Sequence, residues 1–186
     1  MGEKKLDTTL TLDGFLQSVE RRAYRMAVIA TGQREEAFDL VQEAMLKLVK
    51  GYRNRTSEEW GPLFQTILQS TIKDWSRRKK VRQHLHSWFN FNKDSDEEEE
   101  VPWQTVEDTY AERPEEKHYQ QQTRIKLDSA IHELPLRQQQ AFLLRQWQGL
   151  DVASTAQSMG CSEGSVKTHY SRAVHSLRNK LEGYWP

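Results

Sequence analysis

The segment 151–181 constrains the fold of this 186-residue chain more than any other, because two short helical patterns meet there at a tight turn. Gly160 and Cys161 supply the turn, and the Ser162 hydroxyl suits the N-cap of a following helix because it can accept an unpaired backbone amide. Apolar residues at helical spacing mark the inward faces, with Val152, Ala153, Ala156 and Met159 before the turn and Val166, Tyr170, Ala173, Val174, Leu177 and Leu181 after it. This arrangement predicts a helix-turn-helix.

The second helix of such a unit enters the major groove of DNA with its N-terminal end first. Its outward side chains here are short polar groups able to reach base edges and cations able to contact phosphates, namely Ser162, Glu163, Ser165, Lys167, Thr168, His169, Ser171 and Arg172. The helix dipole also favours a phosphate at this end. Arg145, just upstream, is a candidate to contact the DNA backbone, and the alternative is an ordinary solvated arginine. The alternative for the whole unit is a helical hairpin that only packs.

The rest of the chain is also helical in pattern, since period-two alternation and hairpin turns are nearly absent. One N-terminal helix has Met26 on its inward face and ends at Thr31 and Gly32, and a second runs over about 35–50. A polar loop follows, and Pro62 suits the first turn of a third helix. That helix ends in a basic cluster formed by Arg77, Arg78, Lys79, Lys80 and Arg82. The prediction is an all-α protein with two small helical domains.

Charge is distributed very unevenly between these domains and the segment that joins them. Residues 86–117 contain eleven acids and three lysines or arginines, whereas the formal charge of the whole chain is zero. Helical periodicity disappears there, and Pro102 and Pro114 interrupt the segment. Such a composition is typical of a linker that cannot form its own core. We therefore predict an N-terminal domain over 1–85, an acidic flexible linker over 86–122 whose aromatic residues contact a partner, and a C-terminal domain over 123–186.

Several functional classes find no support in the residues. Cys161 is the only cysteine, so it is expected to be a small packed residue and not part of a disulfide or zinc site. A metal-dependent nuclease would need spaced acidic ligands, but 97–100 is an unbroken acidic run. Nucleotide loops and nucleophile elbows are absent, as are membrane spans and a signal peptide. The expectation is a cytoplasmic, non-enzymatic protein without metal or cofactor. A one-component helix-turn-helix regulator is one functional class that these residues leave open.

Three stretches resemble the extracytoplasmic-function (ECF) sigma factors of bacterial RNA polymerase, and they occur in the order found in that family. EAFDLVQEA at 36–44 resembles the core-binding helix, usually written D-A-x-D-L-V-Q-E. LFQTILQSTIKDWSRR at 63–78 resembles the promoter-melting helix, and LPLRQQQAFLLR at 134–145 resembles the opening of the C-terminal sigma domain. The resemblance covers about 12–85 and 123–182. It implies an alternative sigma factor that binds core polymerase and directs it to promoters.

The resemblance also implies roles for particular residues. Contacts with the clamp helices of the largest polymerase subunit are expected from Asp39, Leu40, Gln42 and Glu43, for which a solvated acidic face is the alternative. Capture of the −10 strand is expected from the loop 54–61 and the following helix, through Trp60, Ser70, Lys73, Asp74, Arg77, Arg78 and Lys79. Trp60 is either a stacking surface for a base or a core residue. Ser70 replaces the asparagine that is usual four residues before the aspartate, so the −10 base preference is expected to differ.

The same resemblance assigns the −35 element to the C-terminal helix-turn-helix, chiefly through Lys167, Thr168, Ser171 and Arg172. The acidic linker is expected to pass through the RNA-exit region of the polymerase. The implied partners are core RNA polymerase, including its clamp helices and flap, promoter DNA, and an anti-sigma factor.

Overall fold

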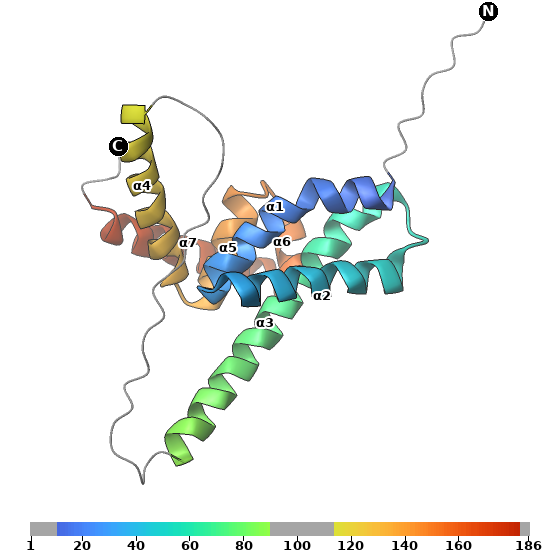
Figure 1. The fold of residues 1–186 in the computed structure, drawn as a ribbon, viewed down its shortest axis with the longest axis horizontal. Helices are drawn as coiled ribbons and strands as arrows, with labels where there is room; N and C mark the ends of the chain where they lie inside the picture. The colour runs from blue at the N-terminus through green and yellow to red at the C-terminus, as the bar shows by residue number, and fades with distance from the viewer. Residues whose placement is uncertain (1–10, 90–113, 183–186) are drawn as a thin grey trace, which may run out of the picture.

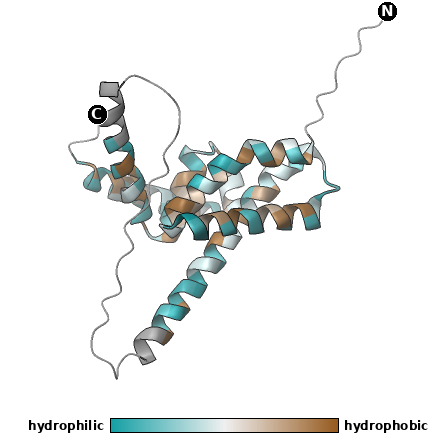
Figure 2. Ribbon diagram, in the orientation of Figure 1, coloured by the Kyte–Doolittle hydropathy of each residue, from teal (hydrophilic) through white to brown (hydrophobic). Residues whose placement is uncertain are grey.

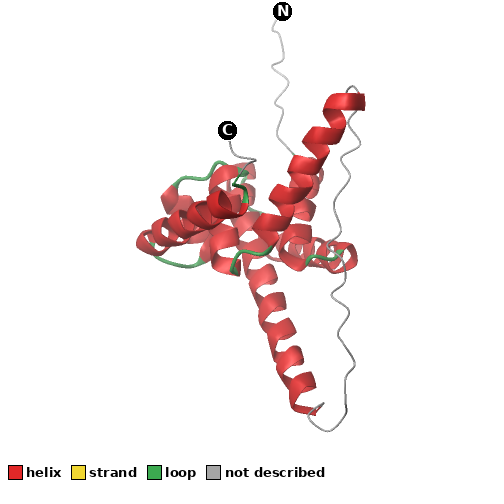
Figure 3. Cartoon of the chain, turned by 90° about the vertical axis from the view of Figure 1, so that its left-hand side faces the viewer, coloured by secondary structure: helices red, strands yellow, loops and turns green. Residues whose placement is uncertain are grey.

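The computed structural model describes residues 11–89 and 114–182, and every regular element within these ranges is an α-helix (Figures 1 and 3). The predicted all-α fold with a C-terminal helix-turn-helix is confirmed. In chain order the helices are α1 (Leu12–Thr31), α2 (Arg34–Tyr52), α3 (Ser57–Phe89), α4 (Pro114–His132), α5 (Leu136–Gln146), α6 (Val152–Met159) and α7 (Glu163–Lys180).

Helices α1, α2 and α3 form an N-terminal bundle, because each has apolar side chains recurring at helical spacing on one face. Burying these faces against one another removes their apolar surface from water, which is the main favourable term in folding. The buried members of this core are Phe15, Ala23, Ala27, Val28, Ala37, Leu40, Val41, Ala44, Leu48, Trp60, Phe64, Leu68, Ile72 and Trp75.

The ends of α1 agree with the signals in the sequence. Thr11 caps the start, where its Oγ1 accepts the backbone N–H of Gly14 at 3.2 Å. Gly32 ends the helix in the left-handed conformation with φ of 75°, as predicted, and its N–H donates to the carbonyl of Val28.

Helix α3 begins earlier and ends later than the sequence predicted. At its start, the backbone N–H and the hydroxyl of Thr56 both donate to Glu59 Oε2 at 3.1 Å. This arrangement stabilises a start at Ser57, so Pro62 lies inside the helix and not in its first turn. The helix continues through the basic cluster to Phe89 as a rod that projects from the bundle, and the rod up to Leu85 is mainly hydrophilic (Figures 1 and 2). Extending a helix that has already started needs no buried face, because each added residue gains one backbone hydrogen bond.

The predicted linker is shorter in the structure, because helices enter it from both sides. Trp88 and Phe89 belong to α3, and α4 begins at Pro114, earlier than the resumption expected near Thr123. Proline is well tolerated at the first position of a helix, and its fixed φ favours that start. The remainder of the acidic segment, including Phe91 and Trp103, lies outside the described residues.

Helices α4 to α7 form a second core, with buried side chains from Ala130, Ile131, Leu134, Ala141, Leu143, Leu144, Ala156, Met159, Val166, Ala173, Leu177 and Leu181. One expectation about α6 was wrong: Ala153 is exposed, and Thr155 and Ser158 are buried instead. Thr155 tolerates burial because its hydroxyl donates to the carbonyl of Asp151 at 2.6 Å.

The two halves of the chain are in contact. Met26 and Ile29 come from α1 but pack in the second core, where each is 1% exposed. The helical pattern predicted that Met26 belongs to the N-terminal core. In the structure its side chain lies in the core of the C-terminal half instead. Helix α1 also contacts α4 and α5, and α3 contacts α6.

Within the described residues, no helix combines the length and the apolar character that crossing a bilayer requires.

Candidate nucleic-acid interface

The turn between α6 and α7 has the geometry that its residues predicted. The carboxylate of Asp151 caps α6 by accepting the N–H of Ser154, and this bond holds the pKa of Asp151 below its ordinary value. Gly160 ends α6 with φ of 60°, a backbone conformation that residues other than glycine rarely adopt. Ser162 then caps α7, where its Oγ accepts the N–H of Ser165 at 3.2 Å. These caps fix the angle at which α7 leaves α6.

The outer face of α7 is available to a ligand. Most of the predicted −35 contact residues are exposed, namely Ser162, Glu163, Lys167, Thr168, Ser171 and Arg172, while Ser165 and His169 are partly buried. Burial, reinforced by the positive charges of Arg137 and Arg172, lowers the pKa of His169. The imidazole is therefore neutral at pH 7 and presents one donor and one acceptor, which suits a base edge better than a phosphate.

Arg145 is engaged within the domain. Its guanidinium donates to the carbonyl of Leu150 in the connection to α6, and it lies 5.9 Å from the centroid of the Tyr170 ring. Tyr170 in turn stacks on Phe142 at 6.4 Å, and its hydroxyl accepts a hydrogen bond from Gln146. In this conformation Arg145 holds α7 against α5, so any contact with the DNA backbone is additional to a structural role.

The outer face of α2 carries most of the predicted polymerase contacts. Asp39 is exposed, and Gln42 and Glu43 are partly exposed; Glu43 also pairs with Lys47 at 2.8 Å. Leu40, in contrast, is 3% exposed and belongs to the N-terminal core, so it positions the helix and presents no surface to a partner. The reason is helical phase, since Leu40 falls on the same side of α2 as the buried residues Ala37, Val41, Ala44 and Leu48.

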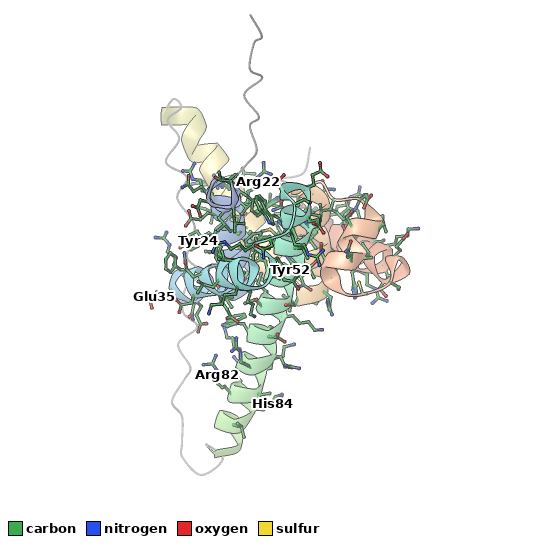
Figure 4. The ribbon with its side chains drawn as sticks, turned by 90° about the vertical axis from the view of Figure 1, so that its right-hand side faces the viewer. Arg22, Tyr24, Glu35, Tyr52, Arg82 and His84 are labelled. Carbon is green, nitrogen blue, oxygen red and sulfur yellow. The ribbon has the colours of Figure 1, made fainter. Side chains whose placement is uncertain are left out.

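The structure adds two apolar residues to this face that sequence reasoning did not select. Phe38 and Leu46 are each 53% exposed, and Leu46 lies two turns after Asp39 on the same side of α2. Phe38 lines a cleft of about 480 Å³ together with Tyr24, Arg34, Glu35 and Asp39. Figure 4 shows Tyr24 and Glu35 on the same side of the molecule. Leu46 could have been noticed in the sequence, because it falls outside the inward pattern of Val41, Ala44 and Leu48.

Helix α3 separates the predicted −10 residues into an exposed group and a buried one. Ser70, Lys73, Arg77 and Arg78 are exposed, and Asp74 and Lys79 are partly exposed. Trp60 is 7% exposed, with its ring 6.0 Å from that of Phe15 in the core. In this conformation Trp60 cannot stack on a base, so the core alternative describes its position.

Several side chains of this exposed group already interact with other residues of α3. Arg77 pairs with Asp74 at 3.4 Å, and the Nζ of Lys79 lies 5.1 Å from the centroid of the Trp75 ring. The hydroxyl of Ser70 donates to the carbonyl of Ile67 at 3.2 Å, so its oxygen can still accept a hydrogen bond from outside the helix.

A second cleft, of about 600 Å³, lies where α3 leaves the bundle, and it contains residues that the sequence reasoning missed. Its lining combines three arginines, one acid and two apolar side chains: Arg77, Arg78, Arg82, Glu36, Trp75 and Val81. The indole N–H of Trp75 donates to the carboxylate of Glu36, which joins α3 to the start of α2. Figure 4 shows Arg82 and His84 on the projecting part of α3. Among the residues that the structure describes, no group of three His, Cys, Asp or Glu side chains could hold a metal ion.

Comparison with known proteins agrees with this geometry. The family model for sigma-70, region 4 matches residues 124–177, which run from α4 into α7 and include the whole turn between α6 and α7. Residues 124–177, which contain the helix-turn-helix, are therefore similar to region 4 of the sigma-70 family.

Several sigma factors are similar to this chain along most of its length. The ECF RNA polymerase sigma factor BldN of Streptomyces coelicolor is 28% identical over 160 residues, covering 85% of this chain and 55% of BldN. The ECF RNA polymerase sigma factor SigM of Mycobacterium tuberculosis is 27% identical, covering 92% of this chain and 77% of SigM. The RNA polymerase sigma factor SigV of Bacillus subtilis is 26% identical, covering 96% of each. Along most of its length the chain is therefore similar to ECF RNA polymerase sigma factors.

A solved structure shares the fold. It is the sigma factor RpoE of Bartonella quintana in complex with the anti-sigma factor NepR, with a TM-score of 0.59 and 21% sequence identity over 90% of this chain and 96% of that one.

Proposed function

We propose that this chain is an alternative sigma factor of the ECF type, which binds core RNA polymerase and directs it to promoters with paired −35 and −10 elements. The observation that carries the proposal is the presence of three separate exposed surfaces on one chain. They are the acidic and apolar face of α2, the basic face of α3 and the polar face at the start of α7. A protein that only bound duplex DNA would need the last of these alone.

Each surface has a role that its chemistry supports. The face of α2, with Asp39, Gln42, Glu43 and the exposed Leu46, combines charge with an apolar centre, as protein interfaces do, and suits the clamp helices of the polymerase. The cations of α3 suit the phosphates of a melted −10 strand, and α7 suits the major groove of the −35 element. The protein itself would carry out no covalent step and would act in the cytoplasm with the polymerase.

Run-off transcription tests the proposal directly. Purified chain and core polymerase are incubated with a library of promoter fragments, and the transcribed fragments are sequenced. We expect start sites that depend on the added chain and share two elements. Lys167→Ala should relax the −35 preference, and Ser70→Asn should change the −10 preference. If the chain bound duplex DNA alone but never redirected initiation, it would be a one-component regulator.

The polymerase-binding face has its own test. The double variant Asp39→Ala with Glu43→Ala should bind core polymerase at least about tenfold more weakly, because charge-assisted contacts at an interface are worth roughly 1.5–3 kcal/mol each. The matched control removes two exposed acids elsewhere, Glu20→Ala with Glu133→Ala. Equal affinities of the two variants, measured by fluorescence titration of core polymerase, would contradict the assignment to α2.

An anti-sigma factor is the further partner that we propose. The RpoE structure was solved with such a factor bound, and the cleft around Trp75 and Val81 in the present chain offers an apolar floor with a basic rim. Co-expression with neighbouring open reading frames, followed by affinity purification, should recover a stable inhibitory complex. Recovery of the chain without any inhibitor would count against this partner.

A further inference from the structure

The projecting part of α3 carries a run of cations that nearby acids do not balance. From Trp75 to Phe89 the sequence contains five lysines or arginines and no aspartate or glutamate. Among the described residues, the pair of Arg77 with Asp74 is the only ion pair that these cations make. Like charges three or four positions apart on a helix repel each other. An anionic partner lying against this part of α3 would remove that repulsion.

One exposed face of α3 continues from the predicted −10 contacts into this run. Its members recur at alternating spacings of three and four residues, which places them in one line along the helix. The line consists of Ser70, Lys73, Arg77, Lys80 and His84, all of which are exposed. The first three are proposed contacts of the melted −10 strand, whereas Lys80 and His84 have no role in that contact. Within the part of the chain that the structure describes, neither of these two side chains has a hydrogen-bond or ion-pair partner.

The line is long enough to reach past the melted element. An α-helix rises about 1.5 Å per residue, so Lys80 lies about 15 Å and His84 about 21 Å from Ser70 along the helix axis. At about 3.4 Å per base pair, these distances correspond to about four and six base pairs of B-DNA. His84 lies on the part of α3 that extends beyond the bundle, where its side chain is exposed (Figure 4).

The order of the chain indicates which way the line points on a promoter. The C-terminal end of α3 leads through 90–113 to the half that contains α7, which is proposed to read the −35 element. The −35 element lies upstream of the −10 element. The end of α3 that carries Lys80 and His84 is therefore expected upstream of the melted strand, where the promoter is still base-paired.

We propose that Lys80 and His84 contact the phosphate backbone of the duplex directly upstream of the −10 element. Helix α3 then holds both the melted strand and the adjoining edge of the duplex. The inference rests on the proposed function and adds a second DNA contact to it. The lysine ammonium pairs with one phosphate, and an imidazole N–H donates to another. Such contacts carry no sequence information, but they fix the position of the fork between single strand and duplex.

Duplex DNA fits this surface better than an acidic protein does. The two side chains continue a line whose earlier cations are proposed to hold phosphates, and the next phosphates of the same strand belong to the duplex. Their charge and hydrogen-bond donors match a regular row of anions, which the DNA backbone supplies at every base pair.

Two DNA probes separate this contact from capture of the melted strand. One is a −10 single strand, and the other is a fork in which the same strand continues upstream as duplex for about one helical turn. Lys80→Gln with His84→Ala removes both proposed contacts. The matched control, Arg82→Gln with Gln83→Ala, removes one cation and one polar side chain from the same exposed rod. Arg82 is two positions from both Lys80 and His84, which is about half a turn, so it lies on the opposite side of α3.

Fluorescence anisotropy with reconstituted holoenzyme measures the affinity for each probe over a series of salt concentrations. For Lys80→Gln with His84→Ala, we expect the slope of log affinity against log salt on the fork to decrease by about 0.9, the value for one lysine–phosphate contact on a duplex. At about 0.15 M salt this corresponds to roughly fivefold in affinity relative to 1 M, and loss of the imidazole contact adds to it. Binding of the single strand should be unchanged, and the control variant should match the unmodified holoenzyme on both probes.

Three results would overturn the proposal. An unchanged slope on the fork would mean that the line binds a partner other than DNA, such as an acidic protein. An equal loss on both probes would place the two side chains on the melted strand, and an equal loss in the control variant would mean that no particular face of α3 is involved. Failure of the proposed function gives a different result, because the unmodified chain would then form no holoenzyme, or one that bound neither probe more tightly than core polymerase does.

Discussion

Neutralising the basic face of α3 should weaken capture of the −10 strand by an amount that depends on salt. The perturbation is the triple variant Arg77→Gln, Arg78→Gln and Lys79→Gln. None of these side chains lies in the core, and that of Arg77 is 76% exposed although it pairs with Asp74. The change should therefore leave the fold intact and remove three cations from one surface.

The magnitude follows from counterion release. Each phosphate contact on a single strand contributes about 0.7 to the slope of log affinity against log salt, so three contacts contribute about 2. At about 0.15 M salt this corresponds to roughly 50-fold in affinity relative to 1 M, or about 2.3 kcal/mol. If Lys79, which lies against the Trp75 ring, made no phosphate contact, the change in slope would be about 1.4.

The assay is fluorescence anisotropy of a labelled −10 single strand with reconstituted holoenzyme over a series of salt concentrations. A charge-matched control neutralises Arg22, Arg178 and Lys180, which are exposed on α1 and α7. Holoenzyme integrity is checked at each concentration by mass photometry. A slope that is the same for the triple variant and the unmodified holoenzyme would refute the assignment of these cations to the strand.

Three further predictions concern stability and pH. Ser162→Ala removes the N-cap of α7 and should lower the free energy of unfolding by about 1 kcal/mol in urea; an unchanged midpoint would contradict this role. Leu48→Ala, at a core position with no exposed surface, should lower the free energy of unfolding by about 2–5 kcal/mol. A decrease below about 1 kcal/mol would mean that the N-terminal core repacks around the smaller side chain. The pKa of His169 is lowered by burial, so the unfolded chain binds its proton more readily, and stability should fall as pH drops below about 6.5. His169→Gln should reduce this acid-side loss in thermal unfolding measured from pH 7.5 to 5; equal losses would argue against burial of the imidazole.

Local features of the fold were predictable because their causes lie within a few residues of one another. The turn at Gly160 and the cap at Ser162 depend on backbone conformation and a hydrogen bond spanning three positions. The same holds for the end of α1 at Gly32. Pro62 predicts a later start for α3 than the Thr56–Glu59 capping pair sets, although both features are visible in the sequence.

The candidate surfaces were only partly predictable, because exposure depends on how a helix is rotated in its bundle. Asp39 and Leu40 are adjacent in a motif that suggested a common role, yet one is exposed and the other lies in the core. Trp60 follows a polar loop, and only its packing against Phe15 shows that its ring is covered. Leu46 fits no inward pattern, and its exposure adds apolar surface to the proposed polymerase-binding face, which the acidic residues alone did not define.

By itself the sequence determined the helical class, the helix-turn-helix, the acidic segment between basic halves and the resemblance to sigma factors, because periodicity, caps and charge are properties of short stretches. Only the tertiary structure decided that Met26 and Ile29 serve the C-terminal core and that Arg25 pairs with Asp128, which is 103 positions away. The physical reason is that a contact between distant segments depends on the joint packing of every helix between them, and no local pattern encodes that.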